Sequence, residues 1–321
     1  MDENTNKTQF KERYVVVGFG WVGQANALAM KMSGLEVAYF DPGEPKHHYG
    51  KFQKQYESLH RLRNVLDKDS ERTWYVVCVG DRVSDEGVQD ITYIKNALES
   101  LKGAKGGVIL RSTILPDLLE DLSFDFYVPE FLHEKKAVEE VLHPYMFVFG
   151  RKSLRPEPKL FSVWKNRAHK IFEGTPREAS FIKYLSNLWN SVRIAFVNEF
   201  GNAIGHPHKK EDLAQIDNVI NFLFDGRSYL RYGKSFGGHC LPKDTRAFKN
   251  WYGQKAKLPL LDGTYASNDV QLALEKEFPL MPEWYSEWPD RHIGGVRAAK
   301  ELWYSFVKNT GLRKVLPRAM W

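Results

Sequence analysis

The residues best suited to chemistry lie in Gly237-Gly-His-Cys-Leu-Pro-Lys-Asp244, which places one of the chain's two cysteines behind a pair of glycines. Lys243 and Asp244 follow Cys240 closely, so a cation and a carboxylate lie near the thiol. A thiol used only in packing needs apolar neighbours, whereas glycines leave room for a ligand. This combination favours a reactive thiolate nucleophile. The alternative for Cys240 is a small buried hydrophobic residue, which is the role we expect for Cys78 in the apolar run WYVVCV.

A second motif predicts a dinucleotide site near the N-terminus. Gly18-Phe-Gly-Trp-Val-Gly23 follows an apolar run and opens an amphipathic segment, the setting that a GxGxxG motif needs. Gly18 is expected to make the tight turn, Gly20 to let the main chain approach a pyrophosphate, and Gly23 to let helix and strand pack closely. The phosphates would then face the helix N-terminus at Trp21 and Val22.

The cofactor preference depends on Asp41, which ends the second apolar run. A carboxylate there accepts hydrogen bonds from ribose hydroxyls and repels a 2′-phosphate, which favours NAD over NADP. Lys46 and His47 lie nearby and would soften that preference. The alternative is a glycine-rich turn that binds no ligand.

Three further groups of polar residues follow predicted strands or share a helix face. Ser112 and Thr113 end the fourth strand, and Glu130 and Glu134 follow the fifth, at the carboxyl edge where such sheets bind ligands. Lys183 and Asn187 are four residues apart and so lie on one face of a predicted helix. The structural alternative for Lys183 and Asn187 is a solvated helix face, and for Glu130 and Glu134 it is a charge pair at a helix N-terminus.

The first half of the chain alternates apolar runs with amphipathic segments. Several runs have no polar alternation, as expected for parallel strands covered on both faces. The pattern predicts a doubly wound α/β fold with a Rossmann-type parallel sheet. We expect strands over 13–19, 35–40, 73–79, 107–112, 124–128 and 145–150, and helices over 22–33, 88–101 and 134–142.

The second half is predicted to be helical. A helical period runs from Glu178 to Ile204, and a helix of that length links domains or forms a dimer seam. Further helices are expected from 208 to about 275, around the glycine-rich segment. We therefore expect an NAD-binding domain over 1–177, a helical domain for dimerisation and substrate over 178–275, and an aromatic-rich tail over 276–321 that covers a hydrophobic surface.

Composition narrows the class of protein. The 321 residues are 43% hydrophobic and 14% aromatic, which fits a folded globular protein. The net charge of +6 comes from scattered Lys and Arg, which suits a solvated surface or a phosphate-bearing small molecule rather than nucleic acid. Two cysteines offer no disulfide framework, and the sequence shows no signal-peptide or membrane-span pattern. We expect a cytoplasmic protein without a metal site.

Taken in order, these motifs resemble the UDP-glucose/GDP-mannose dehydrogenase family. The resemblance covers about residues 13–275, and its most specific part is the Cys-Leu-Pro-Lys-Asp run with Lys183 and Asn187 upstream. The matching stretches are VVGFGWVG, the D-x4-K of DPGEPK, RSTILP, VPEFLHE, EASFIKYLSN with FVNE, and SFGGHCLPKD.

The resemblance implies an NAD-dependent oxidation of a primary alcohol to a carboxylate in two steps, with UDP-glucose as the expected substrate and UDP-glucuronate as the product. Cys240 would attack the aldehyde to give a thiohemiacetal, a second hydride transfer would give a thioester, and water would hydrolyse it. Lys183 and Asn187 would stabilise the oxyanion. Asp244, with Thr113 and Glu134, would position or deprotonate the water.

The resemblance also implies binding residues. Lys46, Lys243 and Thr113 would contact the cofactor. Arg227 and Arg231 are candidate phosphate clamps that reach across a dimer. The full set of expected substrate contacts is Glu130, Phe131, Leu132, Glu134, Lys183, Asn187, Arg231, Tyr232, Ser235 and Gly237.

The sequence departs from the family pattern at three places. Residues after 275 do not resemble the family's third, nucleotide-binding domain. Val79-Gly-Asp-Arg82 replaces the V-P-T-P turn, so a charge stands where a hydroxyl would contact NAD. The loop before Cys240 is two residues short.

Two alternative functions stay open. One is a two-electron dehydrogenase of the β-hydroxyacid type, which shares the chain length, the GxGxxG domain and the K-x3-N helix but needs no cysteine. The other is a protein that retains the NAD fold without turnover. Cys240 is the residue that distinguishes a nucleotide-sugar dehydrogenase from the β-hydroxyacid type.

Overall fold

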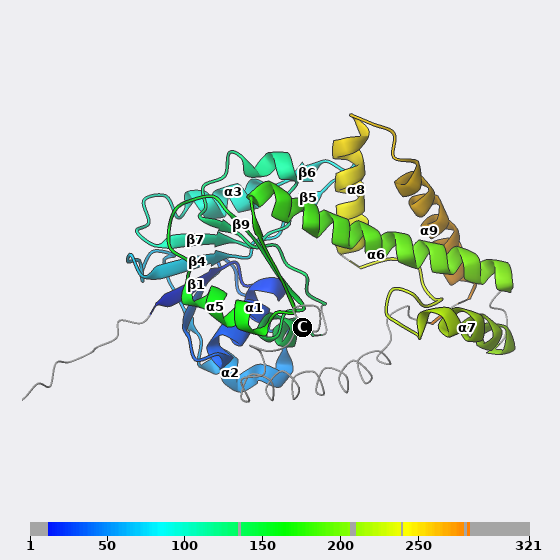
Figure 1. Cartoon of the computed structure of the whole chain (residues 1–321). Coiled ribbons are helices and arrows are strands. Elements are labelled where there is room, and N and C mark those ends of the chain that lie inside the picture. The colour runs from blue at the N-terminus through cyan, green and yellow to red at the C-terminus, as the bar shows by residue number, and fades with distance from the viewer. Residues whose placement is uncertain (1–11, 134–135, 206–209, 239, 279–280, 283–321) are drawn as a thin grey trace, which may run out of the picture. The chain divides into compact units, whose positions relative to one another are not determined.

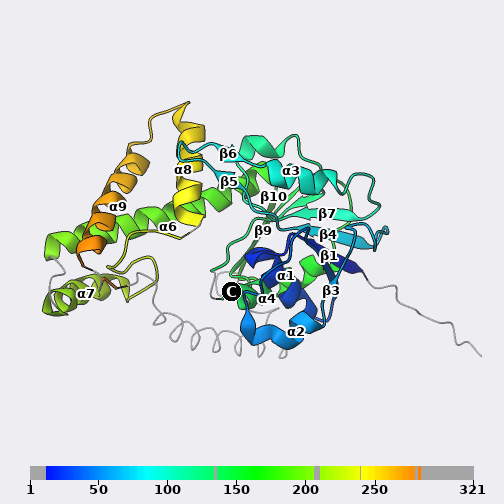
Figure 2. The ribbon, with the colours of Figure 1, turned by 180° about the vertical axis from the view of Figure 1, so that it is seen from behind.

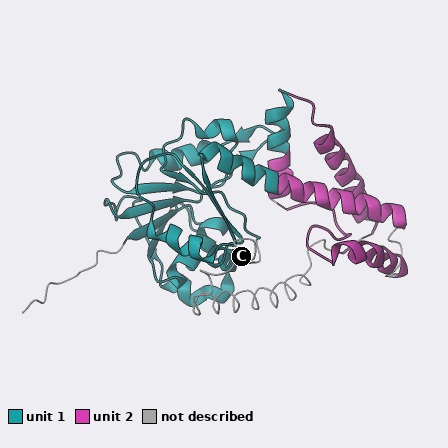
Figure 3. Cartoon of the chain, viewed as in Figure 1, with its two compact units in different colours: residues 1–186, 246–255 teal, residues 187–245, 256–321 magenta. Residues whose placement is uncertain are grey.

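The computed structural model describes residues 12–133, 136–205, 210–238, 240–278 and 281–282. The chain divides into two compact units, one formed by residues 1–186 and 246–255 and the other by 187–245 and 256–321 (Figure 3). The first unit is an α/β sheet domain and the second is helical, which confirms the predicted fold class. The predicted limits at 177 and 275 stay predictions.

The described part of the first unit contains an eight-stranded sheet in the order β10-β9-β8-β7-β4-β1-β2-β3. Its centre is parallel: β1 (Arg13–Val17) pairs with β2 (Glu36–Phe40) and with β4 (Thr73–Val77), and β4 pairs with β7 (Gly107–Leu110). The remaining strands are β3 (His60–Arg61), β8 (Phe126–Tyr127), β9 (Met146–Arg151) and β10 (Lys170–Gly174).

Alternate residues of the central strands pack in two separate hydrophobic cores. In β1, Tyr14 and Val16 belong to one core, and Val15 and Val17 belong to the other. Both faces of the sheet are covered by helices, which is why these strands lack polar alternation (Figures 1 and 2). One face carries α1 (Trp21–Met32), η1 (Gly50–Phe52), α2 (Gln53–Glu57), α4 (Ala137–Leu142) and α5 (Lys159–Arg167). The other carries α3 (Thr92–Glu99), η2 (Pro116–Leu119) and the start of α6 (Pro176–Ile204).

The edge of the sheet differs from the wholly parallel arrangement that the sequence predicts. β9 pairs antiparallel with β8, and β10 is an additional strand that pairs parallel with β9. The intervening helix α4 has six residues and spans about 9 Å, too short to return the chain along the sheet for a parallel crossover. β10 is mostly exposed and contains charged residues, so it does not form the apolar run by which the other strands were predicted.

A short hairpin replaces the start of one predicted helix. β5 (Arg82–Val83) and β6 (Gln89–Asp90) pair antiparallel, and α3 begins at Thr92 rather than near residue 88. The Asp90 carboxylate accepts the Thr92 N–H at 2.8 Å, which satisfies a donor at the helix start. The hairpin turn needs Gly87, whose φ is +88°.

The second unit is built on α6, whose extent confirms the long helix predicted over 178–204. The described helices that follow are α7 (Lys210–Phe224), α8 (Cys240–Gly253) and α9 (Pro259–Glu277). Its core contains Val197, Ile216, Ile220, Tyr232 and Met281. Residues 283–321, most of the predicted tail, lie outside the described residues.

Within the first unit, Asp117 of η2 ties distant parts of the chain together. Its carboxylate accepts hydrogen bonds from Arg177, from the Trp251 indole N–H at 2.8 Å and from Lys255 at 3.3 Å. These donors, Arg177 first, lower the pKa of Asp117 to about 2.

We predict that Asp117→Asn lowers the free energy of unfolding by about 0.5–1 kcal/mol at pH 7, a modest value because the side chain is 40% exposed. The folded-state pKa is depressed, so the contribution is present above the unfolded pKa near 4 and is lost as the pH falls toward 2. Urea unfolding at several pH values measures this. Glu120→Gln, on the more exposed neighbour of Arg177, is the control. A difference between wild type and Asp117→Asn that stays constant from pH 7 to pH 3 contradicts the assignment.

Candidate active site

The glycine-rich turn between β1 and α1 has the geometry that its three glycines predict. Gly18 has φ +86°, a conformation that side-chain-bearing residues rarely adopt. A Cβ on Gly23 would lie 2.0 Å from the Gly18 carbonyl oxygen, so only glycine fits where the helix meets the turn. A Cβ on Gly20 would meet no atom of the described residues within 4 Å, so the main chain there is open to a close approach.

The first turn of α1 is suited to an anion. Among the described residues, no side chain caps this helix end and no acidic residue lies in its first turn. The N–H groups near Trp21 and Val22 and the helix dipole therefore favour negative charge. The Trp21 ring is partly exposed and stacks on His48 at 4.1 Å.

Asp41 lies at the carboxyl end of β2, beside the turn. Its carboxylate accepts the Phe19 N–H at 2.7 Å and the Gly43 N–H at 2.8 Å, which fixes its orientation. Buried Gln24 of α1 holds the adjoining segment, because its amide donates to the Phe19 and Lys46 carbonyls, both at 2.7 Å. The Lys46 side chain is exposed.

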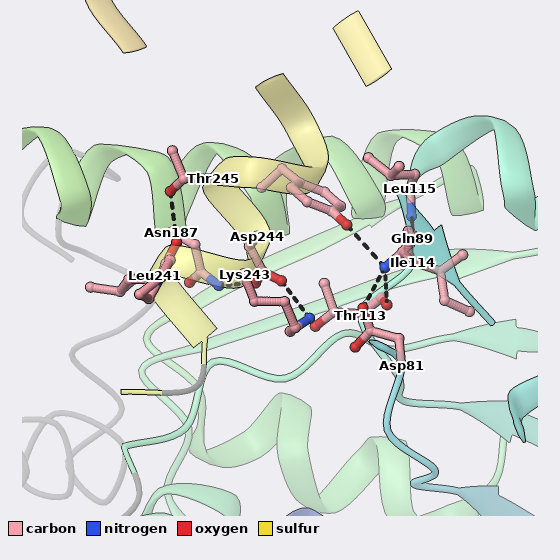
Figure 4. A network of polar contacts seen from close by, with 12 residues as sticks. Asp81, Gln89, Thr113, Ile114, Leu115, Asn187, Leu241, Lys243, Asp244 and Thr245 are labelled. Atoms are coloured by element: carbon pink, nitrogen blue, oxygen red, sulfur yellow. Dashed lines mark hydrogen bonds and ion pairs between the residues drawn. The ribbon is translucent and has the colours of Figure 1, made fainter. Parts of the chain in front are cut away.

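The carboxyl edge of the sheet is organised by Gln89, a residue that the sequence did not single out. Its amide donates to the Asp81 carboxylate at 2.6 Å, to the Thr113 carbonyl at 3.1 Å and to the Tyr184 hydroxyl at 3.3 Å. Its carbonyl accepts the Leu115 N–H at 2.8 Å (Figure 4). Gln89 thus fixes the main chain at Thr113. It also gives an uncharged hydrogen-bond partner to Asp81, the charged residue that stands where the family pattern has a hydroxyl. Its position in a two-residue strand offered no sequence signal.

Glu130, an expected substrate contact, is bound within the first unit instead. Its buried carboxylate pairs with Arg111 and accepts from the Asn26 amide at 3.1 Å. Arg111 also lies over the Trp164 ring, 4.6 Å from its centroid. This packing favours a structural role for the Glu130 side chain. Its other carboxylate oxygen, Oε2, is buried and has no hydrogen-bond partner among the described residues, a position that suits an internal water.

Three other predicted residues of this unit are at least half-buried, and a fourth is not described. Phe131 and Leu132 are half-buried and pack against the two cores. The Lys183 ammonium is buried and lies 5.3 Å from the Phe131 ring centroid. Glu134 lies outside the described residues.

The second unit brings three of the predicted residues together. Asp244 is 1% exposed, and its carboxylate accepts from the Asn187 amide and the Lys243 ammonium, both at 2.6 Å (Figure 4). Buried Ser191 and Thr245 join α6 to α8 one turn away through a 3.1 Å hydroxyl contact. A buried carboxylate needs a cation and hydrogen bonds to stay charged, and both are present here.

The two cysteines lie in opposite environments. Cys240 is exposed and begins α8, where the helix dipole favours a thiolate, rather than lying within a loop. It precedes Asp244 by one helical turn, so both residues are on one face of α8. Cys78 is buried, and burial raises the pKa of its thiol, as expected for a packing residue.

The expected substrate residues in the segment before Cys240 differ in how exposed they are. The Tyr232 ring is 1% exposed and its hydroxyl donates to Asn202 at 2.7 Å, so its side chain belongs to the core. Ser235 is also buried, whereas Gly237 is exposed. Arg231 is half-buried near Asp217, where burial raises the pKa of Asp217 and the Arg231 charge opposes that rise.

Two kinds of site or segment are absent from the described residues. No group of His, Cys, Asp and Glu there is placed to hold a metal ion. No helix within the same ranges has the length and apolar character needed to span a bilayer.

Comparison with known proteins links these residues to a family. The protein-family model described as "UDP-glucose/GDP-mannose dehydrogenase family, central domain" matches residues 177–270. The GDP-mannose 6-dehydrogenase of Pseudomonas aeruginosa is 29% identical over 314 residues, covering 84% of this chain and 70% of that protein. The UDP-glucose 6-dehydrogenase of Rickettsia felis is 27% identical, covering 73% of this chain and 59% of that protein. The matching part spans half of the Pseudomonas syringae GDP-mannose 6-dehydrogenase.

Solved structures show the same architecture. A UDP-glucose dehydrogenase from Pyrobaculum islandicum matches with a TM-score of 0.69 at 23% identity, over 83% of this chain and 69% of that one. A ternary complex of the Pseudomonas aeruginosa GDP-mannose dehydrogenase matches with a TM-score of 0.55 at 25% identity, over 81% and 69% of the two chains.

We predict that Gly23→Ala lowers the free energy of unfolding by about 2–3 kcal/mol, because its methyl group cannot be accommodated beside the Gly18 carbonyl. Gly20→Ala is the matched control. Its methyl group meets no atom, so the change stays within about 0.5 kcal/mol. Thermal and urea unfolding compare the two variants, and equal stability losses would contradict this account of the turn.

Proposed function

The chain belongs to the UDP-glucose/GDP-mannose dehydrogenase family, and from this we propose that it oxidises the primary alcohol of a nucleotide sugar to a carboxylate with NAD. The observation that carries the proposal is the pair formed by exposed Cys240 and buried Asp244, one helical turn apart on α8. A two-electron dehydrogenase has no use for this thiol.

The glycine-rich turn fits the proposed cofactor. The open space at Gly20, the uncapped start of α1 and the oriented Asp41 carboxylate suit a pyrophosphate and an adjacent ribose. Lys46, Thr113 and Lys243 would complete the contacts. Bound NAD would supply the hydride acceptor for both oxidations.

In the proposed reaction the Cys240 thiolate attacks the carbon of the aldehyde that the first oxidation produces. The new carbon–sulfur bond converts the aldehyde to a thiohemiacetal, and Lys183 and Asn187 stabilise its oxyanion. Loss of a hydride from that carbon gives a thioester, which is more reactive than the final acid. Water then adds to the thioester carbon and the thiolate leaves, which regenerates Cys240.

Asp244 is proposed to direct the hydrolytic water, with Thr113 and Glu134. Its carboxylate is fixed by Lys243 and by Asn187, so its orientation is set before substrate arrives. A fixed carboxylate spends no free energy on reorganisation during the reaction. The same hydrogen bond makes Asn187 a positioning partner of Asp244.

UDP-glucose is the proposed substrate, with UDP-glucuronate as its product. GDP-mannose is the second candidate, because the relatives with the higher identities bear the name GDP-mannose 6-dehydrogenase. An assay that offers each nucleotide sugar separately distinguishes the two. The cytoplasmic location remains a proposal that rests on the small number of cysteines.

We also propose a homodimer that forms through α6. Four large apolar side chains on this helix, Leu185, Trp189, Phe196 and Phe200, are between 54% and 70% exposed. Their spacing of four, seven and four residues places them on one face, and Phe196 and Phe200 stack together. A second copy of the same helix would bury this face in a two-fold interface.

We predict that Cys240→Ser lowers the rate of acid formation at least about a thousandfold, because a serine hydroxyl is a poor nucleophile without an adjacent base. Cys78→Ala, at the buried cysteine, is the control and should retain activity. Chromatography of the acid formed from UDP-glucose or GDP-mannose measures both. Acid formation by Cys240→Ser at the wild-type rate would exclude the thioester route.

A second prediction concerns assembly. Trp189→Lys should convert a dimer to a monomer at micromolar concentration, because it places a charge within the apolar face. Leu154→Lys, at a residue 98% exposed in the first unit, should leave the dimer intact. Light scattering after size exclusion gives the mass. A wild-type monomer, or a dimer that survives Trp189→Lys, would overturn the α6 interface.

A further inference from the structure

The main chain just before the cysteine segment is held by side chains rather than by regular secondary structure. Asn198 of α6 accepts the Gly233 N–H at 2.9 Å and donates to the Lys234 carbonyl at 2.9 Å. Asn268 of α9 accepts the Phe236 N–H at 2.6 Å and donates to the Phe236 carbonyl at 3.2 Å. Each side-chain amide therefore pairs with the main chain at two points, as a neighbouring strand would.

Two more residues of α9 complete this set. Gln271 donates to the Gly233 carbonyl, and its own carbonyl accepts from the Asn202 amide at 2.9 Å. The Glu275 carboxylate accepts the Ser235 N–H. Every residue from 233 to 236 thus has a main-chain group bound by a side chain of α6 or α9.

Burial makes this arrangement specific. Asn198 and Gln271 are each 1% exposed and Asn268 is 8% exposed, so water cannot readily replace the main-chain partners. A buried amide that loses its partners is costly, which opposes any other conformation of the segment. The amides therefore fix residues 233–236 in one conformation.

The fixed segment ends four residues before the thiol. Gly237 and Gly238 follow Phe236, and Gly238 has φ +72°. Glycines carry no side chains that could bind this stretch. The described restraints on the main chain here are therefore the hydrogen bonds at Phe236 on one side and the start of α8 at Cys240 on the other, only four residues apart.

We propose that Asn198, Asn268 and Gln271 are positioning residues for Cys240. Together they form an amide clasp, defined by these three side chains, that holds residues 233–236 and so fixes the thiol for attack on the aldehyde. This inference rests on the proposed function, and it assigns a purpose to residues that touch neither substrate nor cofactor in the proposal.

The test compares Asn268→Ala and Asn198→Ala in the full-length protein with Ser267→Ala. Ser267 is the matched control, because its hydroxyl joins α9 to the Ala195 carbonyl of α6 at 3.2 Å without touching the segment. Hydrogen–deuterium exchange of the peptide that contains residues 233–236, the rate of Cys240 alkylation by iodoacetamide, kcat, and KM for NAD are measured for each variant. Asn268→Asp, which retains the acceptor for Phe236, serves if the alanine variants do not fold.

The clasp predicts at least tenfold faster exchange in the segment, an alkylation rate changed at least threefold, and kcat reduced 10–100-fold in Asn268→Ala, with KM for NAD within twofold of wild type. Ser267→Ala should match wild type in all four. A folded Asn268→Ala with wild-type alkylation and kcat would overturn the proposal, whatever its melting temperature. If the wild type forms no acid, exchange and alkylation still decide the clasp, and the proposed function alone fails.

Discussion

The buried carboxylate of Asp244 is the constraint on which the second unit depends. A charge that is 1% exposed is stable only with close partners, and here Lys243 supplies the cation and Asn187 the amide. Because Asn187 belongs to α6 and Asp244 to α8, the requirement of one carboxylate fixes the angle and register between two helices. The Ser191–Thr245 contact one turn away reinforces the same register.

The same principle recurs where the chain has no regular structure. Gln89 holds the edge of the sheet by bonding to Asp81, Thr113 and Leu115, and the amide clasp holds residues 233–236. In both places a side-chain amide, which donates and accepts at once, satisfies main-chain groups that no strand satisfies. These irregular segments thus acquire the rigidity that helices provide elsewhere.

The sequence predicted the features that local physics decides. The continuous apolar runs of β1 and β4, the period of α6 and the spacing of the glycine-rich turn each depend on neighbours in the chain. The exposed strand β10 and the antiparallel β9 escaped prediction, because the first is polar and the second follows from the length of α4. Tyr232 resembled a substrate contact, but Gly201, far away in the chain, leaves room for its ring. Gln89 and Asn268 were not identified, because an isolated polar residue carries no signal in the sequence until the fold supplies its partners.

In the proposed function, one active site oxidises a primary alcohol to a carboxylate with the loss of four electrons. The most direct measurement is the amount of NADH formed when a limiting, known quantity of UDP-glucose or GDP-mannose is fully consumed by the wild-type protein. The proposed four-electron oxidation gives two NADH for each nucleotide sugar, with no aldehyde released to a trapping hydrazine. One NADH per nucleotide sugar, with the aldehyde accumulating, would contradict it.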